Sequence, residues 1–243
     1  MNGPSEAVRR ARVAQVQSGK PLAIILAGHN GSGKSTMWSK HLASRLKMPL
    51  INADRMMMTI LPDRGRRSLP RWAQKLRDEN ESWMSVAQKG IEAFVVHAMS
   101  HKVPFAMETV FSHWKERTDG SVESKIDRIQ ELQRSGYFVL LLFVGLTNAE
   151  LSVGRVATRV EGGGHAVSDG KLLERFPRTE RAIREATMVA DAAILTDNSR
   201  GLDNAFTVCR IQIGASETYD LRSEHAPVPA EIDSWMSVVS PRA

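Results

Sequence analysis

An eight-residue segment near the N-terminus combines glycines, a lysine and a serine at a spacing that suits phosphate binding. The segment reads Gly28-His-Asn-Gly-Ser-Gly-Lys-Ser35, directly after an apolar run and before a stretch of helical period. Glycines let the backbone curve around a phosphate, the amides at the start of a helix donate to its oxygens, and a lysine adds positive charge. The serine hydroxyl is a ligand for Mg²⁺ in such loops. The pattern predicts a loop that binds the phosphates of ATP together with Mg²⁺.

We expect every residue of this loop, and the one that follows it, to contact the nucleotide. The expected contacts are Gly28, His29, Asn30, Gly31, Ser32, Gly33, Lys34, Ser35 and Thr36, with Lys34 also catalytic and Ser35 holding the metal. The loop alone leaves the reaction open, since motors, GTPases, ABC ATPases and small-molecule kinases all use it. The chain contains neither an N-K-x-D guanine-reading pattern nor an LSGGQ-like signature. A compact kinase is the interpretation that remains.

Two carboxylates follow later apolar runs and are the candidates for proton transfer and acceptor binding. Asp54 comes after the run at Pro49–Asn52, and Glu108 directly follows Pro104–Met107. In an open parallel sheet, ligands bind beyond the carboxyl ends of the strands, so both acids are expected beside Lys34. Phosphoryl transfer needs a group that orients or deprotonates the attacking hydroxyl, and Asp54 is the predicted base. The alternatives are an N-cap role for Asp54 and a solvent-facing turn for Glu108.

Cations from outside the loop are expected to stabilise the charge of the transferred phosphoryl group. Arg155 and Arg159 lie one turn apart on a predicted helix and so share a face, for which the alternative is an exposed basic surface. The glycine-rich stretch Glu161–Asp169 resembles a mobile lid that would carry Arg175 onto the phosphates. His165, inside that stretch, is expected to contact phosphate or acceptor, unless its role is structural.

These residues require an α/β framework that brings distant segments together. Apolar runs of strand length fall at Leu22–Ala27, Pro49–Asn52, Pro104–Met107, Tyr137–Val144 and Ala192–Thr196. Segments of helical period lie between and after them, at about Lys34–Lys47, Asn80–His101, Val122–Arg134, Asn148–Val160 and Asp169–Ala190. This alternation predicts a three-layer P-loop sandwich, with a parallel sheet covered by helices on both faces.

Composition limits the class of protein and its surroundings. The chain has 243 residues, 33 basic and 27 acidic side chains, and a net charge of +6, which suits anionic partners and leaves nucleic acid open. The lone Cys209 excludes an internal disulfide. No apolar run is long enough to cross a membrane, and we expect a cytoplasmic protein. We divide the chain into an N-terminal helical extension (1–20), a P-loop kinase domain (21–213) and a C-terminal appendage (214–243).

Five motifs in order give the chain a family resemblance over about Pro21–Ser199. They are LAGHNGSGKST (26–36), NADR (52–55), METVFS (107–112), RVATRVEGGGHAVSD (155–169) and TDNS (196–199). In this pattern the chain resembles the zeta-toxin family of P-loop kinases, in its branch of small stand-alone proteins known as predicted ABC-type ATPases. The resemblance implies that Asp54 is the general base and that Lys34 and Arg159, with Arg155 as a neighbour, meet the ATP phosphates. It also implies that Glu92 helps to bind a sugar-nucleotide acceptor.

The resemblance also suggests substrates and partners. The substrate-binding set expected from it and from the strand ends is Asp54, Arg55, Glu92, Glu108, Thr109 and His165. Well-known members phosphorylate the 3′-hydroxyl of UDP-N-acetylglucosamine, relatives use other nucleotide compounds such as NAD, and many members pair with a neutralising antitoxin protein. The acceptor loop ETVFSHWKERTDGS (108–121) lacks the glycine-rich turn of the sugar-nucleotide pattern, so the acceptor stays open.

Two further functions stay open on the sequence. A polynucleotide 5′-hydroxyl kinase could use the basic segment Arg64–Arg71 and the aromatic rings of Trp72, Trp83 and Trp114 to hold a strand of nucleic acid. A regulator could bind ATP through the loop without turnover.

Overall fold

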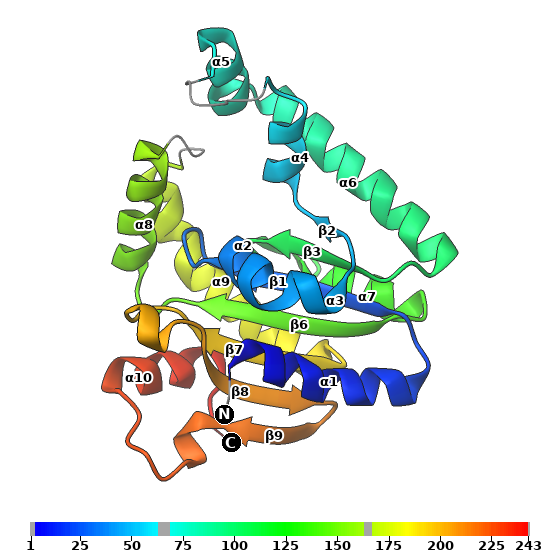
Figure 1. Cartoon of the computed structure of the whole chain (residues 1–243), viewed down its shortest axis with the longest axis vertical. Helices are drawn as coiled ribbons and strands as arrows, with labels where there is room; N and C mark the ends of the chain where they lie inside the picture. The colour runs from blue at the N-terminus through cyan, green and yellow to red at the C-terminus, as the bar shows by residue number, and fades with distance from the viewer. Residues whose placement is uncertain (1–2, 63–68, 163–166, 243) are drawn as a thin grey trace.

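The order of strands places the predicted phosphate loop near the middle of a sheet. A computed structural model describes residues 3–62, 69–162 and 167–242. Within them, one sheet has the order β2-β3-β1-β6-β7-β8-β9 (Figure 1). Its strands are β1 (Leu22–Gly28), β2 (Leu50–Ile51), β3 (Phe105–Thr109), β6 (Phe138–Gly145), β7 (Ala192–Asp197), β8 (Thr207–Ile213) and β9 (Ser216–Asp220).

The parallel part of the sheet confirms the α/β class predicted from the apolar runs. The strands β2, β3, β1, β6 and β7 pair in parallel, and every residue of β1 and β6 is buried. Continuous apolar strands are typical of parallel sheets with both faces covered. The antiparallel strands β8 and β9 extend one edge. They were not predicted, because they lie beyond the last strand–helix alternation.

Helices cover both faces of the sheet. One face carries α1 (Pro4–Ser18) and a continuous helical segment made of α2 (Lys34–Met37), the π-helical turn η1 (Trp38–Leu42) and α3 (Ala43–Leu46). The other face carries α7 (Ile126–Arg134), α9 (Asp169–Val189), α10 (Ala230–Val239) and part of α6 (Glu81–His101). Because alternate residues of a strand point to opposite faces, Ile24 packs with the first layer and Ile25 with the second.

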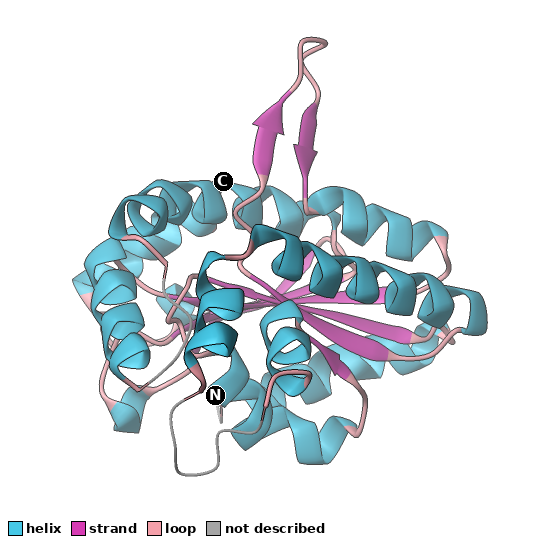
Figure 2. Ribbon diagram, turned by 90° about the horizontal axis from the view of Figure 1, so that it is seen from above, coloured by secondary structure: helices cyan, strands magenta, loops and turns pink. Residues whose placement is uncertain are grey.

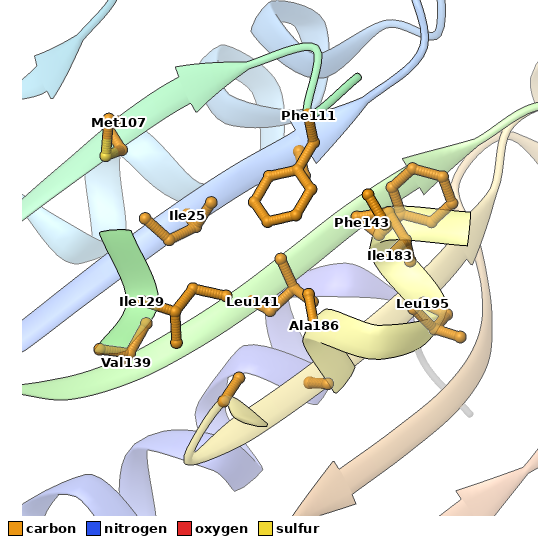
Figure 3. Packing of buried hydrophobic residues seen from close by; sticks show 14 of the residues in the cluster. Ile25, Met107, Phe111, Ile129, Val139, Leu141, Phe143, Ile183, Ala186 and Leu195 are labelled. Atoms are coloured by element: carbon orange, nitrogen blue, oxygen red, sulfur yellow. The ribbon is translucent and has the colours of Figure 1, made fainter. Parts of the chain in front are cut away.

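Figure 3 shows the second layer, in which Ile25, Leu141 and Phe143 of the sheet meet Ile129 of α7 and Ile183 of α9. All five side chains are buried. The terminal segments belong to the same two layers. Ala7 and Val8 of α1 join the first core, and α10 contributes Ile232, Trp235, Met236 and Val239 to the second. The first and last helices are therefore packed on the sheet.

A smaller lobe stands beyond the carboxyl ends of the parallel strands. It contains α4 (Ala53–Thr59), α5 (Arg71–Glu79) and the first half of α6 (Figure 1). Leu61, Leu69 and Ala73 form its own small apolar cluster. On the other side of the same opening, α8 (Ala149–Glu161) leads to the N-terminal half of α9. The lobe and the helix pair thus face each other across the end of the sheet.

A hairpin replaces the first turn of one predicted helix. The segment Val122–Arg134 divides into β5 (Val122–Ser124) and α7, and β5 pairs with β4 (Trp114–Glu116) in a ribbon that projects from the body (Figure 2). The amide of Ile126 donates to the Ser124 hydroxyl at 3.1 Å, and the amide of Ser124 donates to Asp127 at 3.2 Å. These local bonds start the helix at Ile126 and leave residues 122–124 to pair as a strand. The remaining elements are the short 3₁₀ turns η2 (Leu202–Asn204) and η3 (Leu221–Ser223).

None of the helices in the described part of the chain is long and apolar enough to cross a membrane.

Candidate active site

The phosphate loop, Gly28–Ser35, joins the end of β1 to the start of α2. Gly31 and Gly33 have φ values of 72° and 92°, a left-handed conformation that glycine adopts without steric cost. A Cβ at Gly28 would lie 2.4 Å from the carbonyl oxygen of Val144, so a larger residue cannot occupy this position without a shift of the backbone. The glycines are therefore required by the shape of the loop, which leads its amides to the N-terminus of α2.

Lys34 is buried inside the curve of this loop. Its Nζ donates to the carbonyl oxygens of Gly28 at 3.1 Å and His29 at 2.9 Å, and the side chain is only 8% exposed. Burial lowers the pKa of Lys34 from 10.5 to about 8, although the nearby charges of Glu108 and Asp54 act in the opposite direction. The lysine is thus a poorly hydrated cation, which an anionic phosphate would stabilise.

Ser35 and Glu108 meet at the mouth of the loop. The Ser35 hydroxyl lies 3.0 Å from both carboxylate oxygens of Glu108. The pairing of β3 beside β1 sets this contact, because it aligns Glu108 with Leu26 near the end of β1. Mg²⁺ prefers oxygen ligands and usually keeps one or two protein carboxylates together with phosphate oxygens and water. The hydroxyl and carboxylate present here fit that set of ligands.

Asp54 lies in the first turn of α4 and lines the cleft described below. The cap of α4 is Asn52, whose side chain accepts a hydrogen bond from the amide of Arg55 at 3.1 Å. The N-cap alternative for Asp54 is therefore wrong, and its carboxylate is exposed at the carboxyl end of β2. Arg55 is exposed as well, but it is not among the described residues that line the cleft.

A cleft of about 1010 Å³ connects the phosphate loop to the smaller lobe, α8, α9 and the hairpin. Of the predicted residues, its described lining includes Asn30, Gly31, Lys34, Asp54, Glu108, Thr109, Arg159 and Arg175. His29 and Ser32 are buried behind the loop, whereas Ser35 and Thr36 are exposed on α2. Sequence reasoning thus placed residues from five separate segments around one cavity.

The lining is strongly basic. Its described lysines and arginines are Lys34, Arg77, Lys115, Lys125, Arg159, Lys171, Arg175 and Arg178, against the acids Asp54, Glu79 and Glu108. Arg178 follows the same glycine-rich stretch as Arg175 and was expected beside it, whereas Lys171 was not predicted, although it lies about one turn from Arg175 on α9 and so shares its face. Lys115 lies in β4, within the expected acceptor loop (108–121), and Lys125 directly follows β5.

Arg155 and Glu92 also lie outside the described lining of the cleft. Arg155 is half-buried on α8, and its Cβ would be 3.0 Å from a Cβ at Gly31, so it packs against the outer side of the loop. Glu92 forms an ion pair with Arg128 of α7. Gln88, one turn earlier than Glu92 on the same helix, lines the cleft instead. His165 lies outside the described residues, as does most of the basic segment Arg64–Arg71.

Side chains from distant elements hold the loop from behind. Asn198, which follows β7, donates to the carbonyl oxygen of Ser32 at 2.8 Å and accepts from the amide of Phe206 at 3.3 Å. Ser152 of α8 donates to the carbonyl oxygen of Asn30 at 2.8 Å. The TDNS motif therefore supports the loop from the carboxyl end of β7, at the same edge of the sheet. A role of this kind was not predicted, because nothing in the motif itself indicates its partner.

The projecting hairpin is fixed to α9 by Arg181. The guanidinium carbon lies 4.6 Å from the centre of the Trp114 ring, and a guanidinium nitrogen lies 3.5 Å from a carboxylate oxygen of Glu116. A cation over the face of an indole is attracted to its π electrons. Trp114 also lines the cleft. The hairpin thus forms part of the wall opposite the phosphate loop.

A parallel sheet with a glycine-rich phosphate loop, a buried lysine and acids at the ends of neighbouring strands defines a P-loop phosphotransferase. The zeta toxin family model matches residues 6–223, and the chain belongs to this family. The enzyme is accordingly a kinase that uses a hydroxyl group as acceptor. The family match begins within α1 and ends at η3, so it includes nearly every element that surrounds the cleft.

Individual proteins also resemble this chain. An uncharacterised protein of Haemophilus influenzae (strain KW20 / Rd) is 27% identical over 154 residues, which cover 63% of this chain and 91% of that protein. Among solved structures, one from the PezAT chromosomal toxin–antitoxin system of Streptococcus pneumoniae matches with a TM-score of 0.55 and 16% identity, over 98% of this chain and 86% of that one. The structure of AvrRxo1-ORF1:-ORF2 with ATP matches with a TM-score of 0.60 and 15% identity, over 98% and 71%. At these identities the structures show a shared fold.

Proposed function

We propose that this protein transfers the γ-phosphoryl group of ATP, with Mg²⁺, to a hydroxyl of a small nucleotide-like molecule, with Asp54 as the general base. The main support for the proposal is that three charged side chains lie at the same edge of the sheet. Asp54, Lys34 and Glu108 lie at the carboxyl edge of adjacent strands and line one cleft. The charges of both acids also act on the pKa of Lys34, so all three groups lie within electrostatic reach.

The reaction assigns a separate task to each group. The amides of the phosphate loop and Lys34 bind the β- and γ-phosphates, and Arg159 and Arg175 approach from the facing helices. Asp54 accepts the proton of the acceptor hydroxyl while the oxygen of that hydroxyl bonds to the γ-phosphorus. The bond between the γ-phosphorus and the bridging oxygen of the β-phosphate breaks at the same time, which releases ADP. Mg²⁺ held by Ser35 and Glu108 would neutralise charge on the phosphate oxygens.

The far half of the cleft is suited to an anionic acceptor with a flat ring. It presents the cations of Arg77, Lys115 and Lys125 and the ring of Trp114. A nucleotide carries phosphates and an aromatic base, for which cations and an indole are complementary groups. UDP-N-acetylglucosamine and related nucleotide compounds belong to this class. We assign acceptor contacts to Thr109 and Gln88, with Gln88 in the place on α6 first expected for Glu92.

We further propose that a small protein partner restrains this activity in the cytoplasm, where ATP is available. The support is the fold shared with a structure from the PezAT toxin–antitoxin system. A toxin role predicts that expression of the chain slows growth, and that Asp54→Asn abolishes this effect at equal protein level. Equal inhibition by both forms would count against a toxic kinase activity.

Mass spectrometry of a metabolite extract incubated with the enzyme and Mg-ATP tests the kinase proposal directly. We expect one or more nucleotide-like compounds to gain a phosphoryl group with the wild-type protein. Asp54→Asn should lower this rate by about 10²–10⁴-fold, the usual contribution of a general base, while ATP binding is retained. An added 5′-hydroxyl oligonucleotide distinguishes a polynucleotide kinase, which would phosphorylate it preferentially. ATP binding without any phosphorylated product would instead indicate a regulator.

A further inference from the structure

The side chain of His29 links the phosphate loop to both helices that bring cations into the cleft. Its imidazole is 2% exposed and stacks on the ring of Phe176 in α9, with ring centres 3.9 Å apart and planes within 8°. Its Nδ1 accepts a hydrogen bond from the amide of Leu146 at 3.3 Å. Leu146 lies between β6 and α8, the helix of Arg159.

The same residue also holds the lysine of the loop. The carbonyl oxygen of His29 accepts a hydrogen bond from Nζ of Lys34 at 2.9 Å. The backbone of His29 therefore helps to set the position of Lys34, while its side chain contacts the backbone that leads into α8 and the N-terminal half of α9. The residue joins three segments whose cations must converge on one triphosphate.

The contact with α9 falls at the weakest point of that helix. Pro177 lies inside α9, and because proline has no amide hydrogen the helix lacks one internal hydrogen bond there and tends to bend. Arg175 precedes this point and Arg178 follows it, and both line the cleft. Phe176, between them, is held by the stack on His29. The stack therefore fixes the helix where its two cleft-lining arginines could otherwise separate.

Histidine combines two properties that this position requires. A flat ring is needed for the stack on Phe176, and an acceptor is needed because a buried amide such as that of Leu146 is costly when unpaired. Phenylalanine would keep the ring but lose the acceptor. Burial and the charge of Lys34 lower the pKa of His29 to about 3, so the ring remains neutral and Nδ1 remains an acceptor at physiological pH.

We propose that His29 is a positioning residue that holds the cations of α8 and α9 in place relative to Lys34. Its buried side chain lies outside the described lining of the cleft and acts through Arg159 and Arg175. This inference rests on the proposed kinase function, because the position of the cations matters only if a triphosphate binds between them. The contact itself exists without nucleotide and can be tested separately.

Amide hydrogen exchange of the ligand-free protein tests the contact. In His29→Ala, the amides of α9 from Leu172 to Phe176 should exchange several-fold faster than in the wild type. Val8→Ala is the control, because it shortens a buried side chain of α1, which packs on the face of the sheet opposite to α9, and it should leave these rates unchanged once global stability is taken into account. Equal exchange in His29→Ala and in the wild type overturns the inference, whatever the nucleotide does.

Calorimetric titration with Mg-ATP tests the consequence through a double-mutant cycle. In the wild-type background, Arg175→Ala should weaken Mg-ATP binding about tenfold, the typical effect of a lost charged hydrogen bond. In the His29→Ala background it should weaken binding less than twofold, because Arg175 is already displaced. The same loss in both backgrounds, or no loss in the wild type, overturns the inference. A protein with the expected exchange behaviour that does not bind Mg-ATP would overturn the kinase proposal alone.

Discussion

The hydroxyl of Ser35 lies 3.0 Å from both carboxylate oxygens of Glu108, although the two residues are 73 positions apart in the chain. The parallel pairing of β1 with β3 makes this contact, since it brings the ends of both strands to the same edge of the sheet. The fold thus brings the hydroxyl after the loop lysine next to a carboxylate near the end of the neighbouring strand.

Glu108→Gln should weaken the affinity of the enzyme for Mg²⁺ in a measurable way. The amide keeps a hydrogen-bond acceptor for Ser35 but removes the negative charge that a divalent cation needs. We expect the Mg²⁺ concentration for half-maximal activity to rise by about 10–100-fold, the range seen when a supporting group of a metal site is lost. Activity titrated with Mg²⁺ at saturating ATP measures this change. An unchanged Mg²⁺ requirement would assign Glu108 to the acceptor alone.

The affinity for Mg-ATP should depend on the protonation of Lys34. The pKa of Lys34 in the ligand-free protein is about 8, and only the protonated lysine attracts phosphate. Above that pH, each further unit leaves about one tenth as much charged lysine, so the dissociation constant should rise about tenfold between pH 8.5 and 9.5. Below pH 7.5 it should be nearly constant. Calorimetric titrations over this range measure the effect.

Lys34→Arg provides the control for that profile. Arginine stays charged throughout the range, so any affinity that the variant retains should be independent of pH between 7 and 9.5. A variant with the same loss of affinity above pH 8 as the wild type would show that another group titrates.

Acid should destabilise the protein partly through His29. Its pKa in the folded state is about 3, below the ordinary value of 6.5, so the unfolded chain binds the extra proton between these values. The free energy of unfolding therefore falls as the pH drops below about 6.5, by up to about 1.4 kcal/mol per pH unit for this group. In His29→Phe this contribution is absent.

A second buried group, Glu180, acts on the pH dependence of stability in the opposite direction. It is present in both the wild type and His29→Phe, so comparing the two proteins isolates the contribution of His29. Burial raises the pKa of Glu180 from 4.5 to about 7, so the folded state holds a proton there and gains stability as the pH falls through that window. Urea unfolding of both proteins at pH 7, 6 and 5 measures their free energies of unfolding. The wild type should lose stability relative to His29→Phe as the pH falls. A constant difference would mean that folding does not lower the pKa of His29.

Two glycines should respond to alanine with opposite signs. A Cβ at Gly145 would lie 2.1 Å from the buried indole of Trp235, so Gly145→Ala should lower the free energy of unfolding by about 1–3 kcal/mol. Gly154, in the middle of α8, has nothing within 4 Å of an added Cβ. Gly154→Ala should raise stability by about 0.5–1 kcal/mol, because alanine is the better helix former. Chemical denaturation of the two variants measures both effects, and equal signs would contradict the packing of Trp235.

The two arginines of α8, Arg155 and Arg159, show what helical spacing can and cannot predict. The spacing of Arg155 and Arg159 correctly predicted a shared helical face, because that depends only on the period of the helix. It could not tell which end of the face reaches the phosphates. Arg159 lines the cleft, whereas Arg155 lies beside Gly31, and this difference is set by how α8 packs on the loop. On α6, likewise, the prediction for the acceptor site fell on Glu92, whereas Gln88, one turn earlier, lines the cleft.

The sequence by itself determined the phosphate loop, the five parallel strands and the acids that follow two of them. These features depend on adjacent residues: a glycine pattern with a lysine, or a continuous apolar run that only a doubly covered strand explains. The tertiary structure decided which side chains meet across the chain, such as Ser35 with Glu108, His29 with Phe176 and Trp114 with Arg181. Such contacts depend on packing between elements, and a side chain carries no local signal of its partner.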